Sequence, residues 1–180
     1  MGLDLPAGLD PLLAGVRASW PAIDEDALHA AAQHWHTIAA ALRERGTAAG
    51  AAIRDVVAGQ AGQDVHALAE HWAGGPASQL DDAALAAEAI GAALQTTAAV
   101  VLELKAMTIA QLGILAARLC RPASTPDALT TLADRAAALA ATRTSLRLAG
   151  RSAHEVLDGP LVRVLGAAEH TLRTALAAVR

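Results

Sequence analysis

The chain has 180 residues, of which 54% are hydrophobic and only 2% aromatic, and its net charge is −4. This length suffices for one domain whose core needs no disulfide or metal. The 13 Arg residues and the single Lys are spread along the chain. That distribution excludes the basic stripe of a nucleic-acid-binding protein and gives no reason to expect an anionic membrane as partner.

Alanine, the strongest helix former, dominates the apolar residues, and the chain has no Tyr and no Phe. Strand-forming residues never alternate over a long run. We therefore predict an all-α protein, an elongated antiparallel helical hairpin or bundle with long helices, followed by C-terminal helices. Its core has to be built from Leu, Val, Ile and Ala side chains.

Proline and glycine punctuate residues 1–23. Trp20 precedes Pro21, and a residue before proline is pushed out of the helical conformation. We expect this segment to be an extended arm with one short turn of helix around residues 12–19.

The N-terminal sequence lacks the features of a Sec signal peptide. It has no basic region, and Asp4 and Asp10 interrupt its apolar residues. The longest uncharged run in the apolar middle of the chain, residues 89–102, is too short to cross a bilayer. We expect a soluble protein made in the cytoplasm, with no membrane span.

The first strong helix is predicted over residues 24–59. Asp24 is its N-cap, and Glu25 and Asp26 place acidic side chains where they suit the helix dipole. Gly46 is a candidate kink. Apolar residues at three- and four-residue steps form one stripe: Leu28, Ala31, Trp35, Ile38 and Leu42.

Two further helices follow a glycine-rich turn at residues 59–65. The first, over residues 64–72, is predicted to end at the sequence AGGPAS. The second is a very long helix from Ser78 to about Cys120, with Pro122 just beyond its end. Its stripe consists of Leu94, Ala98 and Val101, and then Leu112, Leu115 and Leu119.

The C-terminal part of the chain is predicted to form two more helices. Thr125 and Pro126 supply an N-cap and a first helical position, and this helix ends at about Leu148, before Gly150. SAHE at residues 152–155 has the pattern of a capping box.

Asp158-Gly159-Pro160 is interpreted as a turn. After that turn, a last helix is predicted over residues 160–179.

The seven histidines do not form a recognisable metal motif. His66 and His71 are five residues apart, which places them on different sides of a helix. His154 and Asp158 are one turn apart, but the capping box already explains Glu155. We expect no metal site. Cys120 is the only cysteine, so no internal disulfide forms, and it is interpreted as a small buried residue.

The chain has no phosphate-binding loop, nucleophile elbow or plausible Cys–His pair. We therefore expect no catalytic residue and no cofactor. The residues alone indicate a soluble helical bundle that acts through protein interactions, and not an enzyme. A ligand- or metal-binding bundle that uses His66, Glu70 and His154 is an open alternative.

The order of features is more specific than any one motif. WPAIDEDALHAAAQHWHTIAAAL is followed by GQAGQDVHALAEHW and by a long helix that ends in ELKAMTIAQLGILAARL. Over about residues 18–120 this order resembles the WXG-like group of type VII-secreted proteins. It is similar in particular to the N-terminal helical domain of actinobacterial secreted toxins, the outer-membrane channel toxin N-terminal-like domain.

The resemblance assigns roles to individual residues. The turn of the hairpin falls at Gln60-Ala61-Gly62, with Gln60 in place of the family's Trp. Leu68 lies near the aromatic position of the second helix, and Trp72 matches its later Trp. Six residues become candidates for a core stripe or a partner-facing stripe: Trp20, Trp35, Leu42, Leu94, Val101 and Leu112.

The resemblance also implies a function. It indicates a helical module for export or targeting that packs against a small helical partner or forms a homodimer, with the type VII secretion machinery as a further partner. The export signal of such proteins uses a Tyr, which this chain lacks, so the signal would lie on the partner.

We predict a WXG-like hairpin domain with its arm over residues 1–122 and a helical extension over 123–180. A structural or adaptor bundle unrelated to secretion is the main alternative.

Overall fold

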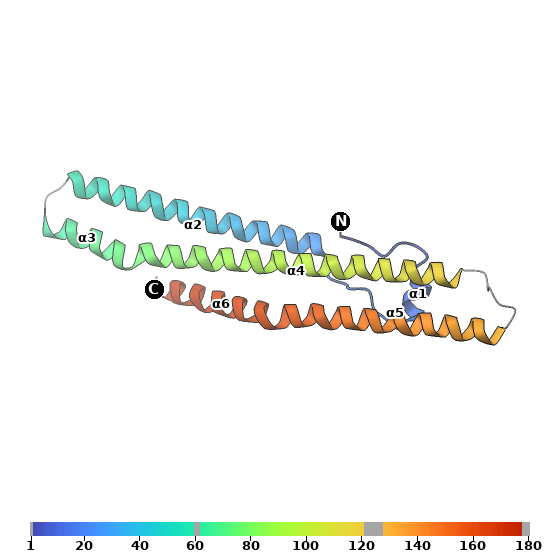
Figure 1. Cartoon of the computed structure of the whole chain (residues 1–180). Helices are drawn as coiled ribbons and strands as arrows, with labels where there is room; N and C mark the ends of the chain where they lie inside the picture. The colour runs from blue at the N-terminus through green and yellow to red at the C-terminus, as the bar shows by residue number, and fades with distance from the viewer. Residues whose placement is uncertain (1, 60–61, 121–127, 178–180) are drawn as a thin grey trace. The chain divides into compact units, whose positions relative to one another are not determined.

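The computed structural model describes residues 2–59, 62–120 and 128–177 (Figure 1). No strand occurs in these ranges, which confirms the all-α prediction. Six α-helices and one π-helical segment follow one another: α1 (Asp10–Gly15), α2 (Glu25–Gly59), α3 (Gln63–Gly74), α4 (Pro76–Leu119), α5 (Ala128–Val156), η1 (Leu157–Leu161) and α6 (Val162–Ala177).

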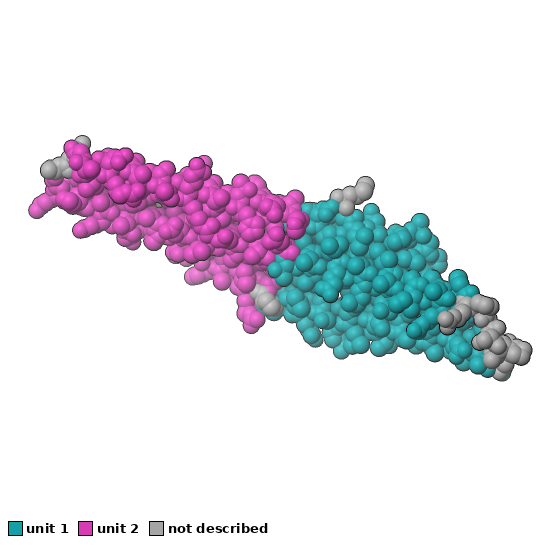
Figure 2. All heavy atoms as spheres, turned by 45° about the horizontal axis from the view of Figure 1, so that its top comes forward, with its two compact units in different colours: residues 1–28, 96–159 teal, residues 29–95, 160–180 magenta. Residues whose placement is uncertain are grey.

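The chain folds into two compact units, which Figure 2 shows in different colours. Unit 1 contains residues 1–28 and 96–159, and unit 2 contains residues 29–95 and 160–180. Each unit therefore combines segments that are distant in sequence, and α4 contributes to both. The two domains predicted from the sequence, residues 1–122 and 123–180, instead follow one another along the chain. That division stays a prediction.

The start of α2 is confirmed. The Asp24 carboxylate accepts hydrogen bonds from the backbone N–H groups of Asp26, at 2.9 Å, and Ala27, at 3.2 Å. These bonds satisfy two donors of the first helical turn, which have no partner within the helix. From there α2 continues through Gly46 to Gly59, as the apolar stripe predicted.

The break between α3 and α4 is shorter than predicted. The helix expected to end at Trp72 continues to Gly74, and α4 begins at Pro76 instead of Ser78. Only Gly75 interrupts the helical path. Proline is tolerated at the first helical position because its missing N–H would have no helical partner there.

The predicted stop at Gly150 is wrong. Helix α5 continues to Val156, so Ser152 and Glu155 lie inside the helix and do not form a capping box. A glycine inside a helix costs about 1 kcal/mol relative to alanine, which is too little to end a helix that packs along its length. The predicted cap at Thr125 and Pro126 lies outside the described residues.

The turn predicted at Asp158-Gly159-Pro160 is also wrong. These residues belong to η1, the π-helical segment that connects α5 to α6. A wider π-helical turn accommodates a proline, which donates no hydrogen bond to the helix. Helix α6 accordingly begins at Val162 and not at residue 160.

The N-terminal arm is not merely extended. It contains α1, slightly earlier than the predicted turn, and it buries Leu13 and Val16. They form the core of unit 1 with Leu112, Leu115 and Leu146. Eight partly buried residues pack against this core: Leu5, Leu9, Leu12, Ala18, Trp20, Leu119, Ala138 and Leu139.

Unit 2 has a different core, made of small residues. Its buried hydrophobic residues, among those described, are Ala32, Ala39, Ala84, Ala86, Ala87, Ala93 and Ala168. At Gly91 even a methyl group would lie 2.8 Å from Cε1 of His36. The side chains at these positions therefore let neighbouring helices approach closely.

Candidate functional site

The predicted hairpin turn lies in the connection between α2 and α3. Gly62 immediately precedes α3, whereas Gln60 lies outside the described residues. Trp72 reaches α2, because its indole Nε1 lies 3.6 Å from the position a Cβ would take at Gly50. Leu68 is 45% exposed and contributes little to this packing.

The six residues of the predicted stripes fall into two groups. Val101 and Leu112 are buried, and Leu112 belongs to the core of unit 1. The other four are half-buried: Trp20, Trp35, Leu42 and Leu94. Unit 1 contains Trp20, Val101 and Leu112, and unit 2 contains the other three.

In unit 2, Trp35 lines an open groove of about 510 Å³. Ile90, Leu165 and Leu172 line the same groove, so α2, α4 and α6 all contribute to it. An ion pair between Arg173 and Glu169, 2.5 Å apart, lies beside these apolar side chains.

A buried ion pair in unit 1 was not predicted from the sequence. Lys105 Nζ lies 2.5 Å from Oε2 of Glu25, and both side chains are less than one-tenth exposed. The ammonium also lies 5.7 Å from the ring centroid of Trp20, which is within cation–π range. The N–H of Leu3 donates to the other carboxylate oxygen of Glu25.

These contacts keep the Glu25 carboxylate charged. The hydrogen bond from Lys105 and then the one from Leu3 lower the pKa of Glu25 from 4.5 to about 2. These contacts connect the arm, the start of α2 and α4, and no buried side-chain nitrogen or oxygen in the described ranges lacks a hydrogen-bond partner. Because both side chains are buried, the pair acts as a structural tie between these segments.

One signal in the sequence could have revealed that Lys105 has a buried partner, although not which residue it is. Lys105 is the only lysine, and it occurs in the middle of an apolar helix. A lone lysine there requires a buried partner. Sequence reasoning assigned Glu25 only to the dipole of α2, because its partner is 80 residues away.

No group of three or more His, Cys, Asp or Glu side chains in the described ranges could hold a metal ion. His154 pairs with Asp158 at 2.8 Å on an exposed surface. Cys120 is exposed, contrary to the prediction that it is buried. It directly follows the last residue of α4, where the helix ends.

One helical stretch, Gln63–Leu119, could cross a membrane by length and composition alone. Its most apolar 18-residue window has a mean hydropathy of 1.6, and only 33% of that window is buried within the chain. Core helices of soluble proteins have similar composition, and the expected absence of a membrane span stays a prediction.

The arm, the first four helices and the first half of α5 match a known family model. The model of the WXG100 like domain covers residues 6–144. The chain belongs to the WXG100-like domain family. Membership associates this helical protein with type VII secretion. The WXG100-like match extends beyond residues 18–120 at both ends and includes α1 and part of α5.

No curated protein and no solved structure gave a significant match to the WXG100-like chain.

Proposed function

We propose that this WXG100-like chain is a non-catalytic module for export or targeting by type VII secretion, and that it binds a small helical partner. The family match over residues 6–144 carries the proposal. The resemblance to the N-terminal domain of actinobacterial secreted toxins supports a targeting role. Because the chain has no Tyr, the export signal is carried by the partner.

An exposed face of α4 in unit 1 supports the partner's helical nature. It carries Met107 and Ile114, which are 38% and 48% exposed and seven residues apart. Four exposed alanines lie on the same side of the helix: Ala99, Ala106, Ala110 and Ala117. Small residues flanked by large apolar ones suit a second helix, because its backbone can approach closely.

Co-expression with a small WXG-type protein encoded beside this chain tests the proposal. We expect a one-to-one complex by size-exclusion chromatography with light scattering. Ile114→Glu weakens this complex, because it buries a charge in the interface. Leu132→Glu is the matched control, since Leu132 is 60% exposed on α5. A monomer that captures no partner, or a homodimer through α4, contradicts the proposal.

Export is tested separately in a strain with an active type VII system. We expect the chain in the culture supernatant when the partner is present, and only inside cells when the secretion ATPase is deleted. If the chain stays inside the cells equally with and without the secretion ATPase, the result favours the adaptor alternative.

A further inference from the structure

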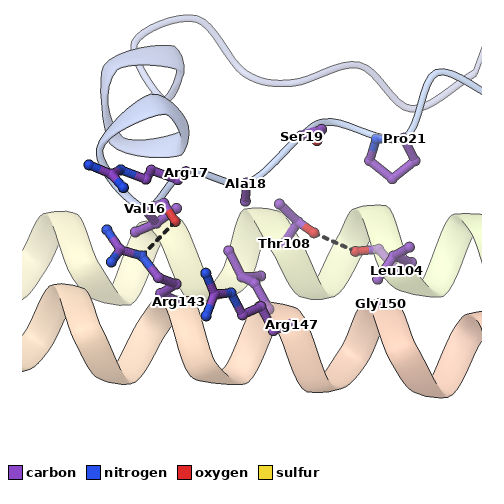
Figure 3. A pocket seen from close by; sticks show the side chains of 11 residues that line it. Val16, Arg17, Ala18, Ser19, Pro21, Leu104, Thr108, Arg143, Arg147 and Gly150 are labelled. Carbon is purple, nitrogen blue, oxygen red and sulfur yellow. Dashed lines mark hydrogen bonds between the residues drawn. The ribbon is translucent and has the colours of Figure 1, made fainter.

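A pocket of about 190 Å³ lies in unit 1 between the arm, α4 and α5 (Figure 3). Three of its lining residues are arginines and none is an Asp or Glu, although the chain as a whole is acidic. The guanidinium groups of Arg17, Arg143 and Arg147 gather at one end of the pocket in Figure 3. This concentration of positive charge needs an explanation.

Arg143 is held in place by the end of α1. Its Nε donates to the carbonyl oxygen of Val16 at 3.0 Å, and its Nη2 donates to that of Gly15 at 3.2 Å. These bonds use two of the five guanidinium N–H donors. The group is therefore fixed and half-buried, with donors to spare for a ligand.

Arg17 occupies a backbone position that normally favours glycine. Its N–H bonds to Ala14 O at 3.0 Å, and the N–H of Ala18 bonds to Leu13 O at 3.2 Å. This pair of bonds is the Schellman motif at the end of a helix. Arg17 has a φ of 52°, a left-handed conformation that disfavours residues with a Cβ. An arginine at this position implies a use for its side chain.

Arg147 follows Arg143 by one helical turn, and like charges at this spacing repel. Neither Arg17 nor Arg147 forms an ion pair with a carboxylate in the described part of the chain. Both side chains are exposed, so they can turn toward a ligand. An anion in the pocket would relieve the repulsion that the folded chain leaves in place.

We propose that this pocket binds the phosphate group of an organic phosphate. A tetrahedral oxyanion offers oxygens to three guanidinium groups at once, whereas a carboxylate has only two oxygens to share. One water molecule occupies about 30 Å³ in the liquid. The pocket, at about 190 Å³, is therefore larger than a single small ion requires. Ala18, Leu104 and Leu146 give it an apolar side where the organic part of the ligand lies.

Hydroxyl groups contribute unequally to this site. The Thr108 hydroxyl donates to Leu104 O at 2.8 Å within α4, so its proton is already used. Ser19 is exposed on the arm and lines the pocket. Its hydroxyl is a further donor for a phosphate oxygen.

Titration of the full chain with inorganic phosphate and with glycerol phosphate tests the site. Calorimetry gives the affinity, and NMR follows the Gly150 amide and the Nε–H groups of Arg17 and Arg147. We expect saturable binding that Arg147→Gln and Arg17→Gly each weaken about tenfold, as loss of a charged hydrogen bond predicts. Arg17→Gly also removes the backbone strain, so a loss of binding there does not come from unfolding.

Arg135→Gln is the matched control, because Arg135 is exposed on α5 about 18 Å along the helix from Arg147. It should leave the affinity unchanged. An equal loss in Arg135→Gln overturns the proposal, and so does a lack of binding to all three probes: inorganic phosphate, glycerol phosphate and vesicles that contain phosphatidic acid. These outcomes are independent of export and of partner binding.

Vesicles that contain phosphatidic acid distinguish a lipid headgroup from a soluble phosphate ester. Binding to these vesicles that needs Arg17 and Arg147, without binding to glycerol phosphate, supports the site and assigns the headgroup as ligand. Vesicle binding that is unchanged in both variants overturns it.

Discussion

The two units pack helices in different ways. Unit 1 buries large side chains, and its described core includes Leu13, Val16, Val101, Leu112, Leu115 and Leu146. Unit 2 buries only alanines among its described hydrophobic residues. Unit 1 also contains the buried Glu25–Lys105 pair, whereas the comparable pair of unit 2, Arg43 with Glu88, is nearly half exposed.

This difference follows from the arm, a segment that only unit 1 contains. Unit 1 has the arm as an additional segment, and its apolar side chains cover α4 and α5. Unit 2 has no such segment, so its helices gain contact by approaching closely over small side chains. Burial of an alanine removes little apolar area from water. Unit 2 is therefore expected to depend on close fit, and unit 1 on the amount of apolar surface buried.

Lys105→Ala should cause the largest loss of stability. It leaves the Glu25 carboxylate buried without its partner, and removing one member of a buried pair is more damaging than replacing both. We expect the free energy of unfolding, measured with urea, to fall by more than it does in the core variant Leu112→Ala.

The double variant Glu25→Gln with Lys105→Met is the control for this change. It should recover most of the lost stability, because no unpaired charge remains. Arg43→Ala in unit 2 should have a small effect, since exposed pairs contribute little. A loss for Lys105→Ala no larger than for Arg43→Ala would show that the pair does not tie the arm to α4.

Leu112→Ala should lower the free energy of unfolding by about 3 kcal/mol, because Leu112 is fully buried and truncation leaves a cavity. Leu102→Ala is the matched control on the same helix, since Leu102 is 47% exposed. We expect less than about 0.5 kcal/mol for this control. Similar losses of unfolding free energy for the two variants would contradict the assignment of Leu112 to the core of unit 1.

Ala87→Leu tests whether unit 2 depends on the close fit of small side chains. Ala87 is fully buried, and the added methylene groups have no space between closely packed helices. We expect a loss of about 2 kcal/mol from overpacking, measured by thermal unfolding.

A gain in stability from Ala87→Leu would show that unit 2 has unfilled space. Leu85, which is 58% exposed on the same helix, supplies the control: Leu85→Ala should change stability by less than about 0.5 kcal/mol.

Acid is expected to have a smaller effect through the buried pair than these substitutions, because Glu25 keeps its charge over most of the range in which other carboxyl groups are protonated. Glu25 has its pKa lowered to about 2 in the folded chain, against 4.5 ordinarily. The unfolded chain therefore takes up this proton first. The contribution of Glu25 to stability is complete above pH 4.5 and is lost as the pH falls toward 2.

Added salt should affect the carboxyl pKa values of the two units differently. Arg43 lowers the pKa of Glu88 by a hydrogen bond and by its charge, but solvent and ions reach this pair. We expect added salt to raise the pKa of Glu88 toward its ordinary value and to leave that of Glu25 nearly unchanged. NMR titration of the two carboxyl groups measures both. Equal salt sensitivity would contradict the burial of the Glu25–Lys105 pair.

The sequence by itself determined where the long helices lie and both ends of α2. The stripe from Leu28 to Leu42 predicted the body of α2, and Asp24 predicted its cap. Both are local, because a helix joins residues only three or four positions apart. The family resemblance was likewise legible in the order of helices, and the match over residues 6–144 confirmed it.

Only the tertiary structure decided what the helices do to one another. The extension of α5 through Gly150 and the burial of the arm depend on contacts with α4 that no local pattern encodes. Lys105 and Glu25 are 80 residues apart, and Arg143 reaches back 127 residues to Val16. A sequence read along the chain cannot pair such residues, because their contacts exist only after the helices have packed.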